Sequence, residues 1–76
     1  MILRELLILG TGCAKCSQLE VNAREAVAGT EAEVRHVSDI GEIMKYGVMM
    51  TPALVIDGQV KSVGKVLPVE EIKGLL

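Results

Sequence analysis

The feature that most constrains the fold is the uninterrupted apolar run Leu6-Leu7-Ile8-Leu9, which stops at Gly10. Such a run suits a strand covered on both faces of a sheet better than a strand with one face in water. From Cys13 to about Ala28, apolar residues instead recur every three or four positions, which indicates a helix packed along one side. Its apolar stripe consists of Cys16, Leu19, Ala23, Ala26 and Val27. The two patterns predict a buried strand that leads directly into a helix.

The middle of the chain predicts a second strand and a short helix. Residues 32–37 (AEVRHV) are typical of a strand, and Asp39 with Glu42 resembles the capping box that begins a helix. This helix is expected to end before Gly47. We expect its packed face to consist of Ile40, Ile43 and Met44.

The last third predicts a hairpin and a terminal helix. ALVI and QVKSV flank Asp57-Gly58, a strong signal for a two-residue hairpin turn. Pro68 opens a final helix that is expected to turn Val69, Ile72 and Leu76 toward the core. The order is βαβαββα, so we predict an α/β fold with a mixed four-stranded sheet and helices on both faces. Residues 1–76 are expected to form a single domain.

Composition and charge exclude several classes of function. The net charge of −2 comes from eight basic and ten acidic residues scattered along the chain. They form no basic stripe for nucleic acid or an anionic membrane. The apolar N-terminus is interrupted by Arg4 and Glu5, and no run approaches the roughly 18 apolar residues of a membrane span. We expect a cytoplasmic monomer that binds neither nucleic acid nor membrane.

The only cysteines, Cys13 and Cys16, form a C-x-x-C motif between the first strand and the first helix. In a cytoplasmic protein this motif is more typical of redox chemistry or metal binding than of a structural disulfide. The residues leave four possibilities open: a catalytic dithiol, a copper or zinc site on the two thiolates to which His36 could add, a non-catalytic redox sensor, or an inert pair.

The position of the motif favours redox chemistry. An ordinary thiol, with a pKa of about 8.5, is only slightly ionised at neutral pH. A helix N-terminus at Cys13 and the nearby Lys15 would favour the thiolate. Cys16, one turn deeper on the packed stripe, would stay protonated until a mixed disulfide forms at Cys13.

The sequence also resembles a known family. CAKC after the first strand, Thr51-Pro52 before the third strand, and the hairpin with its terminal helix look like the minimal thioredoxin fold. More narrowly, GTGCAKC and YGVMMTPALVIDGQV resemble the small thioredoxin-like or glutaredoxin-like redox-active disulfide proteins. The resemblance implies a thiol-disulfide oxidoreductase, either a protein disulfide reductase or an electron carrier. It would act on protein or small disulfides, receive electrons from an upstream reductase, and need no cofactor or metal ion.

The resemblance also implies roles for individual residues. Cys13 would be the nucleophile, Cys16 the resolving thiol, and Pro52 a cis-proline beside the disulfide. Thr51 would pair its backbone with a substrate segment. The remaining substrate-binding residues are expected to be Gly12, Lys15 and Met50.

Several positions depart from the family pattern. Thioredoxins carry Trp at the position of Gly12, Gly-Pro at Ala14-Lys15, and a buried Asp at Leu7. Glutaredoxins carry a Gly-Gly pair and an acidic residue after the hairpin, where this chain has Gly64-Lys65. A glutathione site is therefore not expected.

A histidine and three methionines have two interpretations each. His36 is expected to be a surface or boundary histidine that points away from the cysteines, rather than a metal ligand. Met44 fits helix packing better than copper binding. Met49 and Met50 are expected either to pack in the core or to form a soft apolar rim beside Cys13 that accepts varied protein substrates.

Overall fold

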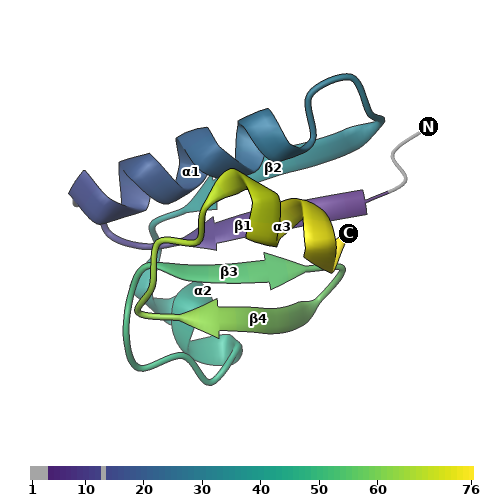
Figure 1. Cartoon of the computed structure of the whole chain (residues 1–76). Helices are drawn as coiled ribbons and strands as arrows, with labels where there is room; N and C mark the ends of the chain where they lie inside the picture. Colours follow the sequence, from purple (N-terminus) through teal and green to yellow (C-terminus); the bar gives the residue numbers. More distant parts are fainter. Residues whose placement is uncertain (1–3, 13) are drawn as a thin grey trace.

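The computed structural model describes residues 4–12 and 14–76. The elements follow the predicted order (Figure 1). They are β1 (Arg4–Leu9), α1 (Ala14–Ala26), β2 (Ala32–Val37), α2 (Ile40–Lys45), β3 (Ala53–Ile56), β4 (Gln59–Val63) and α3 (Val69–Leu75).

The four strands form one mixed sheet in the order β2-β1-β3-β4. β1 runs parallel to β2 and antiparallel to β3, and β3 pairs with β4 as an antiparallel hairpin. Figure 1 shows α1 and α3 on one face of the sheet and α2 on the other. This central position of β1 accounts for its apolar run, because Leu6 to Leu9 are buried on whichever face they point to.

Side chains that alternate along β1 divide the interior into two clusters. Leu6 and Ile8 point toward α1 and α3, where they join Leu19 and Ile72. Leu7 and Leu9 point toward α2 and join a smaller cluster that contains Ile43, Val48, Ala53 and Val55. The predicted stripe of α1 is buried from Cys16 to Ala26, and Val27 just beyond the helix is buried as well.

The start of α2 matches the prediction, but its packed face is narrower. Asp39 is the N-cap, and its Oδ1 accepts hydrogen bonds from the backbone N–H groups of Gly41 (2.8 Å) and Glu42 (3.4 Å). Ile43 is buried, whereas Ile40 and Met44 are 62% and 68% exposed. The expectation that Ile40 and Met44 pack in the interior is therefore wrong. The helix has only six residues, and its single buried side chain is the one that reaches the sheet.

The turn between β3 and β4 confirms the predicted hairpin and ties it to β1. Asp57 and Gly58 have φ values of 51° and 82°, the positive pair expected for this type of two-residue turn. Asp57 Oδ1 accepts from the Glu5 N–H at 3.0 Å, and Asp57 Oδ2 accepts from Arg4 at 2.8 Å. The Glu5 hydrogen bond, followed by that from Arg4, lowers the pKa of Asp57.

Candidate active site

Three segments meet at Gly10, the residue that follows β1. Gly10 is buried, and its N–H donates to the Val37 carbonyl at 3.0 Å. A Cβ atom at Gly10 would collide with Cys16 Sγ and would lie 3.9 Å from the Cβ of Thr51. The close approach of Cys16 therefore requires glycine at this position. The end of β1, the first turn of α1 and the segment before Pro52 converge around one sulfur atom.

The described residues of the cysteine motif, Ala14 to Cys16, form the start of α1. Cys16 is fully buried, as the apolar stripe predicts, and Lys15 beside it is exposed. Gly12 is exposed with φ of 93°, a backbone conformation that favours glycine over Trp or any other residue with a Cβ atom. Cys13 lies outside the described residues, so its role as nucleophile stays a prediction.

The segment before β3 contains a cis peptide bond between Thr51 and Pro52, as the resemblance implied. Pro52 is buried and Thr51 is exposed. The Pro52 carbonyl accepts a hydrogen bond from the Gly64 N–H at 2.8 Å, which links this segment to the end of β4. Thr51 is thus an exposed residue close to the buried Gly10–Cys16 contact.

An apolar groove adjoins this segment. It has a volume of about 300 Å³ and is lined by Thr11, Thr51, Ile40, Ile43, Met44, Val48 and Met49. Met49 is 95% exposed, and Met50, which lies beside Gly64, is 64% exposed. Core packing is therefore wrong for both methionines, and the alternative of an exposed apolar rim fits their positions. Met44, expected inside the core, belongs to the wall of this groove.

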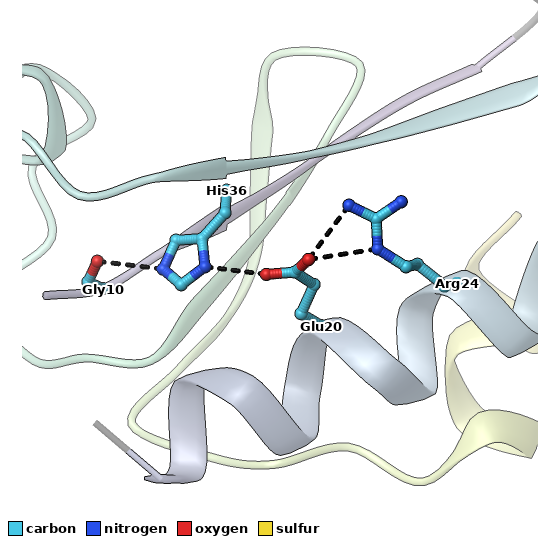
Figure 2. Close-up of polar contacts among 4 residues, drawn as sticks. All are labelled: Gly10, Glu20, Arg24 and His36. Atoms are coloured by element: carbon cyan, nitrogen blue, oxygen red, sulfur yellow. Dashed lines mark hydrogen bonds and ion pairs between the residues drawn. The ribbon is translucent and has the colours of Figure 1, made fainter. Parts of the chain in front are cut away.

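A polar network joins β2, α1 and the end of β1 (Figure 2). His36 Nδ1 lies 2.7 Å from Glu20 Oε1, and His36 Nε2 lies 3.1 Å from the carbonyl oxygen of Gly10. Glu20 Oε2 accepts from Arg24 Nε at 3.0 Å. The hydrogen bond from Arg24, and after it the one from His36, lowers the pKa of Glu20.

His36 is a boundary histidine, as expected, with its side chain 26% exposed. The expectation that it points away from the cysteine motif is wrong, because its ring contacts the Gly10 carbonyl, three residues before Cys13. Alternation along β2 places its side chain on the same face as Val34, which packs with α1. The parallel pairing of β1 with β2 then brings His36 level with Ile8, two positions before Gly10. The sequence alone did not connect His36 with Glu20 and Arg24. The available indication was that Val34 and His36 are two residues apart in a strand, so their side chains lie on the same face of the sheet.

The contacts of His36 bear on metal binding. Both ring nitrogens of His36 face oxygen acceptors, which speaks against the copper or zinc half-site considered from the sequence. In the described part of the chain, no group of three or more His, Cys, Asp and Glu residues has the arrangement of a metal site.

No helix within residues 4–12 and 14–76 combines the length and apolar character needed to cross a membrane.

Comparisons with known proteins agree with this architecture. A family model described as a thioredoxin domain matches residues 4–76. A thioredoxin from Methanothermobacter thermautotrophicus is 43% identical over 74 residues, which cover 95% of this chain and 96% of that protein. A thioredoxin from Methanocaldococcus jannaschii is 43% identical over 68 residues, which cover 87% of this chain and 78% of that protein. The chain therefore belongs to the thioredoxin domain family, as a small thioredoxin-like redox protein with the minimal thioredoxin fold.

Proposed function

We propose that this protein is a thiol-disulfide oxidoreductase that cycles Cys13 and Cys16 between a dithiol and a disulfide. The observation that carries the proposal is the convergence of Cys16, Gly10 and Thr51 at the end of β1. The 43% identity to two thioredoxins supports the same chemistry. In this proposal the protein acts as a reductase or electron carrier for disulfides and needs no bound cofactor.

The first step uses the thiolate of Cys13. α1 begins at Ala14, directly after this cysteine in the chain, and its unpaired N–H groups and the Lys15 ammonium favour a negative charge there. The thiolate attacks one sulfur of a substrate disulfide, a Cys13–substrate S–S bond forms, and the substrate S–S bond breaks. The departing substrate thiolate takes up a proton from water.

The second step uses Cys16, which is buried and lies against Gly10. Its thiol gives up a proton, its sulfur attacks Cys13, and the Cys13–Cys16 disulfide forms as the second substrate thiol leaves. The substrate gains two electrons and two protons, and the protein loses the same number. A dithiol reductase upstream must restore the reduced form.

The surroundings of the site fit protein disulfides. The apolar groove beside Thr51 and the exposed side chains of Met49 and Met50 offer adaptable contacts to varied chain segments. We assign Thr51 to backbone pairing with the substrate, Pro52 to the wall of the site, and Gly12 and Lys15 to its exposed rim. We place the protein in the cytoplasm, where reduced thiols persist. We also propose that it acts as a monomer, because its charges are scattered along the chain.

Insulin reduction by the wild-type protein, Cys13→Ser and Cys16→Ser tests the proposal. We expect Cys13→Ser to lower the rate to the uncatalysed background, because no thiol remains to attack the substrate. Cys16→Ser should instead accumulate a covalent mixed disulfide, visible by mass spectrometry and released by dithiothreitol. Wild-type rates in both variants would exclude the mechanism.

The metal alternative is separated by measuring the mass and metal content of the wild-type chain. Oxidation of a dithiol removes two hydrogen atoms, and dithiothreitol restores them. A one-to-one complex with copper or zinc that persists through this cycle would favour the metal-binding function instead.

A further inference from the structure

The end of β2 forms hydrogen bonds with both backbone polar groups of Gly10. The Gly10 N–H donates to Val37, and the Gly10 carbonyl lies 3.1 Å from His36 Nε2. On its remaining side, the Gly10 Cα faces Cys16 so closely that no Cβ fits between them. A shift of the Gly10 backbone would therefore change the space available to the Cys16 sulfur.

The two partners of His36 require two donors. A backbone carbonyl such as that of Gly10 only accepts hydrogen bonds, and so does an ionised carboxylate. Glu20 is held in its ionised form, since its second oxygen accepts from the Arg24 guanidinium, with N···O distances of 2.9 and 3.0 Å. A neutral imidazole has one N–H group and an imidazolium has two. Only the imidazolium form of His36 can therefore donate to Gly10 and to Glu20 together (Figure 2).

The charges that face His36 come from α1. Among the described residues, Glu20 and Arg24 both lie on that helix, and Gly10, just after β1, contributes an uncharged carbonyl. Glu33 and Arg35, on either side of Val34 in β2, point to the opposite face of the sheet by strand alternation. The side chains of His36 and Glu20 are 26% and 24% exposed, so water reaches the pair and His36 can exchange its proton.

We propose that His36 is a positioning residue for the redox centre: its imidazolium form joins Gly10 to Glu20 and thereby holds the backbone that packs against Cys16. The inference rests on the proposed function, because it concerns the rate of the same thiol exchange. When His36 loses a proton, either Gly10 or Glu20 loses its donor. The contribution of His36 to the rate is therefore present at low pH and falls as the pH rises, whereas thiolate formation increases with pH.

Three variants isolate this contribution. His36→Gln removes the charge, and His36→Arg supplies a permanent cation with several N–H donors. Arg35→Gln is the matched control, because it removes a positive charge from the neighbouring residue on the opposite face of β2. Thermal unfolding of each variant verifies that it is folded at the assay temperature.

The measurement is kcat and KM for insulin reduction across the range in which histidine titrates. At about pH 6 we expect His36→Gln to have a kcat about 10-fold below wild type, because a hydrogen bond to a charged group is lost. The ratio should rise toward one by about pH 8.5, because the charged donor is lost from wild type as the pH rises. His36→Arg should keep a high kcat relative to wild type at both pH values, Arg35→Gln should follow wild type, and KM should not change. A His36→Gln deficit that is constant with pH, or absent at about pH 6, would overturn the proposal.

A second readout does not depend on catalysis. His36 is the only histidine in the chain, so its ring ¹⁵N resonances are assigned directly. In the reduced protein we expect both ring nitrogens to be protonated at low pH, and the Gly10 carbonyl ¹³C resonance to titrate together with them. In His36→Arg the Gly10 resonance should no longer follow this titration. A Gly10 resonance that ignores the ring would refute the coupling even if the protein reduces disulfides. An intact coupling in a protein without reductase activity would refute the proposed function alone.

Discussion

The two sides of the candidate site differ in how tightly they are held. On the α1 side, the Gly10 N–H donates to the Val37 carbonyl and the Gly10 carbonyl pairs with His36, while Cys16 packs against Gly10 without free space. On the α2 side, an open apolar groove is bordered by Met44 and Met49, whose side chains lie mostly in solvent. Thiol exchange needs sulfur atoms in a defined geometry, whereas varied protein substrates need a surface that can adapt. Under the proposed function, the tightly held side would carry the thiol chemistry and the open groove beside it would receive the substrate.

The largest expected effect is on the tightly held side. Gly10→Ala places a methyl group against Cys16 Sγ, so we expect a loss of about 2–3 kcal/mol in the free energy of unfolding, typical of overpacking. Disulfide reduction should fall in parallel, because Cys16 is displaced. Urea denaturation and the insulin assay measure the two effects.

Gly74→Ala is the matched control for Gly10→Ala. Gly74 lies in α3, and a Cβ atom there meets no other atom within 4 Å. The substitution should stabilise α3 by up to about 1 kcal/mol, because alanine favours the helix. Equal stability of the two variants would show that Gly10 is not tightly packed.

An intermediate effect is expected in the groove. Met44→Ser should leave the unfolding free energy within about 0.5 kcal/mol of wild type, because the side chain is mostly exposed. It should raise KM for insulin about 5-fold, equivalent to about 1 kcal/mol of lost apolar contact, and leave kcat unchanged.

Val21→Ser is the matched control for the groove. Val21 is a half-exposed apolar residue of α1 and does not line the groove. Its substitution should not alter KM. If Val21→Ser and Met44→Ser raise KM equally, substrate contact is spread over the surface and is not concentrated in the groove.

The smallest effect concerns Glu20, whose folded-state pKa is lowered from its ordinary value of 4.5, first by Arg24 and then by His36. A lowered carboxyl pKa contributes stability above the unfolded-state pKa, and this contribution is lost as the pH falls through the folded-state value. Glu20→Gln should therefore cost about 0.5 kcal/mol near pH 6 and almost nothing below about pH 3, as measured by urea denaturation. If Glu25→Gln, on the same helix, loses a similar amount of unfolding free energy, the effect comes from the total charge of α1 and not from the contacts of Glu20 with His36 and Arg24.

Much of the fold was predictable because its signals are local. The apolar run of β1, the three-to-four residue stripe of α1 and the Asp57-Gly58 turn each reflect backbone geometry over a few neighbouring residues. The packed face of α2 was harder to predict. The spacing of its apolar residues is the same whether all of them or only one of them contacts the sheet. Ile43 reaches the sheet, whereas Ile40 and Met44 lie beside an open groove.

The element order, the burial of Cys16 and the family resemblance could be read from the chain, because they depend on periodicity and motif spacing. The contacts of His36 with Gly10 and Glu20, which are 26 and 16 positions away, became visible only in the folded structure. Those contacts depend on the parallel register of β1 with β2 and on how α1 crosses them, which no local pattern specifies. The same holds for Gly10, which follows the apolar run as an ordinary strand end but is required there because Cys16 folds back onto it.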